Sequence, residues 1–92
     1  MSVYPILLTR LLATPGALAA LTDSHQGVHT FLARHLSGDW GELSDEERAR
    51  NTLALVTGNP LRSAYRTRLG VPFWIVTEAD RSSTCLLLPE EV

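Results

Sequence analysis

The strongest constraint in this sequence is a change of hydrophobic period at the tripeptide Gly58-Asn59-Pro60. Before it, apolar residues recur every three or four positions, which is typical of one side of an α-helix. After it, they alternate with other residues or form short runs, which is typical of β-strands. A glycine followed closely by a proline also ends a helix, because proline cannot continue it. The chain therefore predicts an α+β fold, with helices first and a sheet last.

Three segments after Pro60 predict the strands of this sheet: Leu61–Thr67, Phe73–Glu78 and Ser83–Leu88. Gly70 marks the turn between the first two segments. Because short connections between successive strands require antiparallel pairing, we expect a three-stranded meander. One face is expected to carry Phe73, Ile75, Leu86 and Leu88, and the opposite face Trp74, Val76, Cys85 and Leu87.

The first part of the chain predicts a short strand and two helices that pack on the meander. Ile6–Leu12 is apolar and follows a proline, so we expect a strand there. Thr14 is a suitable N-cap for a helix over Pro15–Leu21, in which Leu18 and Leu21 share one face. A second helix is expected from Gly27 to about Leu36. The stripe predicted to be buried on that second helix consists of Val28, Phe31, Leu32, His35 and Leu36.

A third helix has the clearest boundaries in the chain. Ser44 and Glu47 are spaced as a capping box, in which each side chain binds the other's backbone N–H. The helix is expected to end at Gly58. Its predicted core face consists of Ala49, Leu53 and Val56.

Composition predicts one soluble domain over residues 1–92, located in the cytoplasm. The 45% hydrophobic and 20% charged residues are those of an ordinary globular protein. No apolar run approaches the ~20 residues of a membrane helix. The single cysteine, Cys85, cannot form an internal disulfide. The net charge of −2 makes nucleic acid an unexpected partner, because such binding depends mainly on neutralising phosphates.

Neither a cofactor nor a metal ion is expected from the motifs. The chain has no phosphate-binding loop, dinucleotide fingerprint, nucleophile elbow or paired-cysteine zinc motif. His25 and His29 have the spacing of two ligands on a helix face. However, His25 lies in the polar break before the second helix, so we interpret both histidines as facing solvent.

Two polar clusters are candidates for a functional site. In the first, His35 either donates a hydrogen bond to a turn carbonyl while half-buried, with Asp39 capping the turn and Trp40 filling the core, or is a proton-exchanging group held by an acid. In the second, Glu78 and Arg81 either pair across a turn that includes Asp80, or act as a base and an anion-binding group. With His35, and with Tyr65 and Arg66 nearby, the latter would resemble the residue set of a metal-independent ribonuclease.

The order of several motifs resembles a family of small uncharacterised bacterial proteins found on plasmids and integrated elements. Some members carry labels that tie them to restriction–modification methyltransferase subunits, although this chain lacks the glycine-rich loop of a cofactor-binding domain. The segments that carry the resemblance are Thr14–Ala17, Arg34–Gly41, Asn51, Ser63–Tyr65, Trp74–Thr84 and Leu87–Glu90.

These observations lead to one expected function and one alternative. We expect a non-catalytic accessory domain, related to a mobile element or to anti-defence, that binds another protein; a homodimer is left open. An exposed aromatic ring beside an arginine is typical of a protein-binding hot spot. The alternative is a small toxin-like ribonuclease that uses His35, Glu78 and Arg81. The expected contact residues are Asp39, Trp40, Tyr65, Glu78, Asp80 and Arg81.

Overall fold

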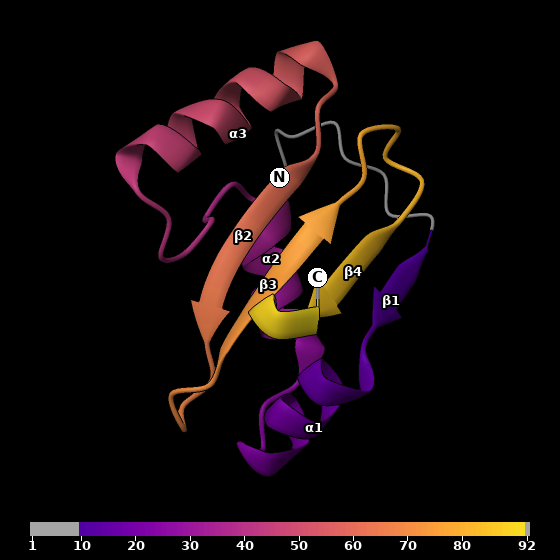
Figure 1. The fold of residues 1–92 in the computed structure, drawn as a ribbon, viewed down its shortest axis with the longest axis vertical. Coiled ribbons are helices and arrows are strands. Elements are labelled where there is room, and N and C mark those ends of the chain that lie inside the picture. Colours follow the sequence, from indigo (N-terminus) through magenta and orange to yellow (C-terminus); the bar gives the residue numbers. More distant parts are fainter. Residues whose placement is uncertain (1–9, 92) are drawn as a thin grey trace.

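The computed structural model describes residues 10–91 and has an α+β fold, which confirms the predicted class. Three helices precede most of a four-stranded sheet, and a single turn of 3₁₀-helix follows it (Figure 1). The predicted strand over Ile6–Leu12 lies mostly outside the described residues. In chain order the elements are β1 (Leu11–Ala13), α1 (Pro15–Asp23), α2 (Val28–Leu36), α3 (Asp45–Thr57), β2 (Leu61–Arg66), β3 (Pro72–Thr77), β4 (Thr84–Leu87) and η1 (Pro89–Glu91).

The sheet has the strand order β1-β4-β3-β2. The antiparallel meander of β2, β3 and β4 is present as predicted, with Ser63 opposite Ile75 and Ile75 opposite Leu86. The short N-terminal strand β1 does not pack on the meander but joins its edge, parallel to β4, with Leu12 opposite Cys85. It can pair in parallel because α1, α2, α3 and two strands separate it from β4 along the chain.

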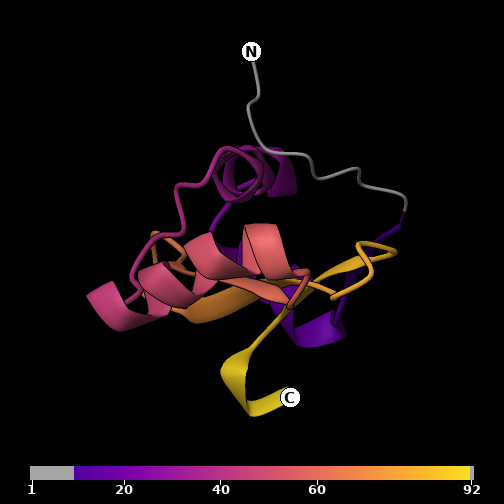
Figure 2. The same cartoon turned by 90° about the horizontal axis from the view of Figure 1, so that it is seen from above.

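The main core lies between one face of the sheet and the helices α1 and α2. Phe73, Ile75 and Leu86 are completely buried on this face, as their predicted alternation required. The ring of Phe31, from α2, meets Phe73 edge-on with centroids 4.9 Å apart, a favoured geometry for two aromatic rings. Leu21 of α1 joins the same cluster. Figure 2 shows α2 on one side of the sheet and η1 on the other.

The predicted core face of α3 is wrong. Leu53 and Val56 are 60% and 84% exposed, and Ala49 is exposed too. The buried residues of α3 are Asn51 and Ala54, because this helix packs against the edge of β2 and not against an apolar face of the sheet. A strand edge presents backbone N–H and C=O groups, so a polar side chain is the suitable contact there. The predicted face of α1 that carries Leu18 and Leu21 is only half buried, since Leu18 is exposed while Leu21 is buried.

Two segments cover the outer edge of β2. The Asn51 side chain donates to the carbonyl of Arg62 (2.7 Å) and accepts from its N–H (3.2 Å). Further along the strand, the N–H of Ala64 donates to the Trp40 carbonyl and the Ala64 carbonyl accepts from Glu42. An uncovered edge invites pairing with other chains. This part of the sheet edge is therefore closed from within the domain.

No helix within residues 10–91 combines the length and the apolar character that crossing a bilayer requires.

Candidate functional site

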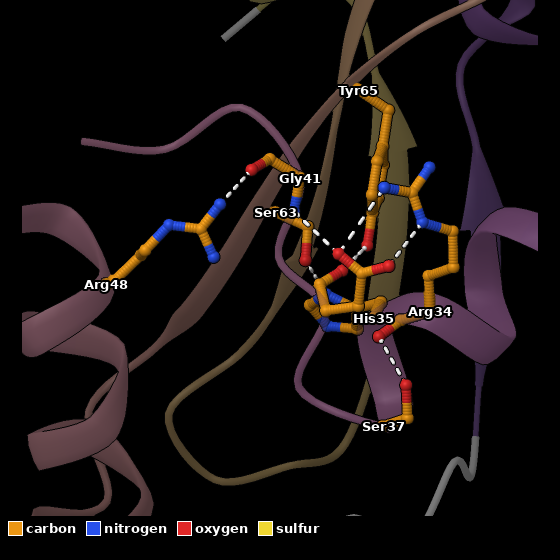
Figure 3. Close-up of polar contacts among 8 residues, drawn as sticks. Arg34, His35, Ser37, Gly41, Arg48, Ser63 and Tyr65 are labelled. Carbon is orange, nitrogen blue, oxygen red and sulfur yellow. Dashed lines mark hydrogen bonds and ion pairs between the residues drawn. The ribbon is translucent and has the colours of Figure 1, made fainter. Parts of the chain in front are cut away.

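His35 lies in a buried chain of hydroxyl groups between α2 and the sheet. Its side chain is completely buried, with Nδ1 2.5 Å from Ser63 Oγ (Figure 3) and Nε2 2.8 Å from Thr77 Oγ1. Thr77 Oγ1 is in turn 2.8 Å from Thr84 Oγ1. A neutral imidazole has one donor and one acceptor nitrogen, and hydroxyls can fill either role. Each nitrogen and hydroxyl in this series can thus have a hydrogen-bonding partner.

Burial lowers the pKa of His35 from its ordinary 6.5 to about 4. The ring is therefore neutral at pH 7. The predicted half-buried position and the bond to a turn carbonyl are wrong, because the side chains of β2 and β3 already supply hydroxyl partners inside the core. Both ring nitrogens bind hydroxyls, so neither is held by an acid. A general acid or base must lie within hydrogen-bonding reach of its substrate, and this ring has no exposed surface.

Asp39 is held on the surface by Arg34 and next to the buried Tyr65. Arg34 donates to the two carboxylate oxygens at 2.7 and 3.3 Å, and its guanidinium lies 4.6 Å from the centre of the Tyr65 ring. The Tyr65 hydroxyl donates to the Asp39 carbonyl at 2.6 Å (Figure 3). The hydrogen bond from Arg34 lowers the pKa of the Asp39 carboxyl. Asp39 also accepts from the N–H of Gly41, as a turn cap does.

Gly41 is the point at which this turn touches β2. Its φ of 73° lies in the left-handed region, and a Cβ there would overlap the Ala64 carbonyl oxygen. Both conditions require glycine. Arg48 of α3 donates to the Gly41 carbonyl (Figure 3), and Trp40, the residue before Gly41, is buried. The Arg34–Gly41 motif therefore builds the closed edge of β2.

Arg81 fastens the β3–β4 hairpin to the end of α3. Its guanidinium donates to the carbonyls of Ala54 (3.0 Å), Asn59 (2.7 Å) and Glu78 (3.1 Å). The Ala54 carbonyl also accepts from the N–H of Gly58, so Arg81 is its second donor, and a cation at this end of the helix suits the helix dipole. The Glu78 side chain is exposed, and Arg81 binds the backbone of Glu78. Asp80 is exposed as well and accepts from Ser82.

The residues of the ribonuclease hypothesis point in different directions. Thr77 turns inward to His35, whereas Glu78, the next residue, is exposed. Arg81 is bound to α3. Within residues 10–91 these three side chains therefore do not line one cleft.

The six expected contact residues also differ in their surroundings. Trp40 and Tyr65 are buried, and Arg81 is occupied by backbone carbonyls. Asp39 is held near Tyr65, which pairs with Phe73, whereas Glu78 follows Thr77 at the opposite end of the β2–β3 ladder.

The second face of the sheet carries none of the six contact residues expected from the sequence. We call it the open face; it consists of Arg62, Ala64, Trp74, Val76, Cys85 and Leu87, all half-exposed. Arg62 lies over the Trp74 ring, 4.4 Å from its centroid, and forms an ion pair with Glu47 of α3. The alternation of β3 placed Trp74 on this face, and the register, in which Arg62 lies opposite Val76, adds Arg62 to it.

A cavity of about 150 Å³ adjoins the open face at Arg62, between α3 and β2. Its other lining residues are Leu43, Glu47, Arg50, Asn51 and Pro60.

His25 and His29 are both exposed, and residues 10–91 contain no group of three His, Cys, Asp or Glu side chains that could hold a metal ion.

Comparison of the chain with family models, with curated proteins and with solved structures finds no match. The resemblance to small plasmid-borne proteins stays an expectation.

Proposed function

We propose that this chain is a protein-binding domain and that the open face is its contact surface. The observation that carries the proposal is the half-exposed Trp74 with the Arg62 guanidinium stacked on it. Tryptophan and arginine are among the residues that most often dominate binding energies at protein interfaces. A cation over an aromatic ring gains about 0.5–1 kcal/mol at an exposed site, which holds Arg62 in one orientation before binding.

The neighbours of this pair suit an interface as well. Val76, Cys85 and Leu87 continue the apolar surface across β3 and β4. On the β2 side, the ion pairs Arg62–Glu47 and Arg66–Glu42 form a polar border. Protein interfaces have this arrangement, with an apolar centre and a polar rim.

The proposal moves the contact surface away from the residues expected from sequence. Trp40 and Tyr65 support the fold from inside, and Arg81 supports α3. Of the remaining expected residues, Asp39 and Asp80 already have local partners in the described structure. The accessory role in a mobile element remains a proposal, and a domain that acts through a partner suits it.

The ribonuclease alternative gains no support from the site. His35, the proposed proton-exchanging group, would have to leave its hydroxyl partners and reach solvent before it could contact RNA. An RNA-cleavage assay that compares the wild type with His35→Ala checks this hypothesis directly. We expect no cleavage above background from either protein.

Site-specific photo-cross-linking tests the binding proposal. A benzoylphenylalanine residue replaces Val76 in the centre of the open face, and in a control it replaces Leu69, which is exposed at the β2–β3 turn. After illumination in the host cell, we expect a discrete adduct from position 76 and none of that mass from position 69. An adduct with a second copy would make the domain a homodimer through this face. Equal adduct patterns from both positions would refute the proposal.

A further inference from the structure

We infer that the partner presents a carboxylate to the cavity between α3 and β2, where Arg50 and Arg62 bind it. This inference rests on the proposed function and names the chemistry of the partner. It predicts a partner segment with an aspartate or glutamate side chain, flanked by apolar residues that pack on the open face.

The first argument is the position of the cavity. Arg62 both lines the cavity and stacks on Trp74, so the cavity opens beside the proposed contact surface. Leu43 and Pro60 supply apolar wall, and Asn51 lines the cavity while binding the backbone of Arg62. The volume of about 150 Å³ is well below the roughly 300–1,000 Å³ of pockets for drug-sized molecules. A single side chain is therefore a more suitable occupant than a nucleotide or a cofactor.

The second argument is the charge at the cavity. Within residues 10–91, Arg50 and Arg10 are the arginines whose guanidinium groups have no hydrogen-bonding partner, and Arg50 lines the cavity. Arg62, which also lines the cavity, pairs with one carboxylate, that of Glu47. A guanidinium has five N–H donors, so Arg62 retains donors after pairing with Glu47. The cavity is thus lined by two guanidinium groups and only one carboxylate, so one positive charge remains for a second carboxylate.

The same charges disfavour a polyanion. Glu47 lines the cavity, Glu42 lies at the border of the open face, and the chain has a net charge of −2. Binding to nucleic acid depends on several cations that each neutralise a phosphate. One unpaired arginine, Arg50, and one arginine that pairs with Glu47, Arg62, match a single carboxylate. The surrounding apolar surface matches a peptide.

Peptide selection tests the inference without knowledge of the partner. A library of random peptides displayed on phage is selected on the immobilised full chain, and the enriched peptides are synthesised. Each acidic residue in them is then changed to its amide, Glu→Gln or Asp→Asn. Affinities are measured by fluorescence anisotropy for the wild type, Arg50→Ala and the control Arg68→Ala. Arg68 is exposed and binds the His25 carbonyl, away from the cavity.

We expect the enriched peptides to contain an acidic residue beside apolar ones. Arg50→Ala should weaken their binding about tenfold or more, because charge-assisted hydrogen bonds contribute at least this factor, whereas Arg68→Ala should change it less than about twofold. The acid-to-amide change should weaken binding to the wild type by a similar factor and have little effect on Arg50→Ala. This loss of the acid's contribution in the variant identifies Arg50 as its partner.

Other outcomes would overturn the inference in distinguishable ways. If acidic and amide peptides bind equally but Trp74→Ala abolishes binding, the carboxylate is refuted and the proposed function stands. If no peptide is enriched, or if neither Trp74→Ala nor Arg50→Ala changes binding, the carboxylate inference and the proposed function are both refuted. If Trp74→Ala does not fold, Leu87→Ser replaces it. If an oligo(dT) strand displaces the peptides in an Arg50-dependent manner, the ligand is nucleic acid and the inference fails.

Discussion

Lowering the pH from 7 to 5 should destabilise the fold through His35. The imidazole has a pKa of about 4 in the folded state because it is buried, and about 6.5 when the chain unfolds. Between these values the unfolded state binds more protons, so the free energy of unfolding must rise with pH. The stabilisation is fully present above pH 6.5, is lost as the pH falls toward 4, and does not change further below that.

The size of the effect follows from the shift. A difference of about 2.5 pKa units corresponds to about 3 kcal/mol over the whole window, of which about 2 kcal/mol is lost between pH 7 and pH 5. For a domain with a total stability of roughly 5–10 kcal/mol this is a large fraction. Asp39, Asp80 and Glu91 also have lowered pKa values in the fold, but they affect stability at more acidic pH.

Urea unfolding, followed by tryptophan fluorescence at several pH values between 5 and 7.5, measures the effect. His29→Gln is the matched control, because His29 is exposed on the same helix, and this variant should keep the pH slope. The variant His35→Gln should lose most of this dependence of stability on pH. Long-range ¹H–¹⁵N spectra of the wild type report the protonation of His35 directly, even if the variant does not fold. A His35 that titrates near pH 6.5 in the folded protein would refute the reasoning.

Three further substitutions test the contacts around β2 and α3 by their effect on the free energy of unfolding. Gly41→Ala should cost about 2 kcal/mol or more, because its backbone is left-handed and a Cβ meets Ala64. Asn51→Ala should cost about 2–3 kcal/mol, because it leaves a strand N–H and C=O without partners. Leu53→Ser should change stability by less than about 0.5 kcal/mol, since the side chain is 60% exposed; a loss above 2 kcal/mol would show that α3 is placed wrongly.

Local signals in the sequence were sufficient for the helices and the meander. The Ser44–Glu47 capping box and the left-handed Gly58 mark the two ends of α3, and both are present in the structure. These signals act within four residues, so no tertiary information is needed to read them. The alternation in β3 likewise places Phe73 and Ile75 inside and Trp74 on the open face.

The orientation of α3 and the partners of His35 depend on contacts between distant residues. Periodicity predicted that Leu53 faces the core, but it cannot show whether a helix meets a sheet face or a sheet edge. Asn51 decides that question by binding the backbone of Arg62, eleven positions away. The hydroxyl partners of His35 come from two strands, 28 and 42 positions further on. A pattern in one segment does not contain such pairings.

The bond between Arg81 and the end of α3 has a consequence during synthesis of the chain. The ribosome completes α3 well before it adds Arg81, so the hydrogen bond from Arg81 to the carbonyl of Ala54 can form only after 27 more residues have been added. The strand β4, which brings Thr84 and Leu86 into the core, comes later still. The growing chain therefore cannot assemble the domain one piece at a time. We expect it to acquire protection against proteases in a single step, once nearly the whole sequence has left the exit tunnel.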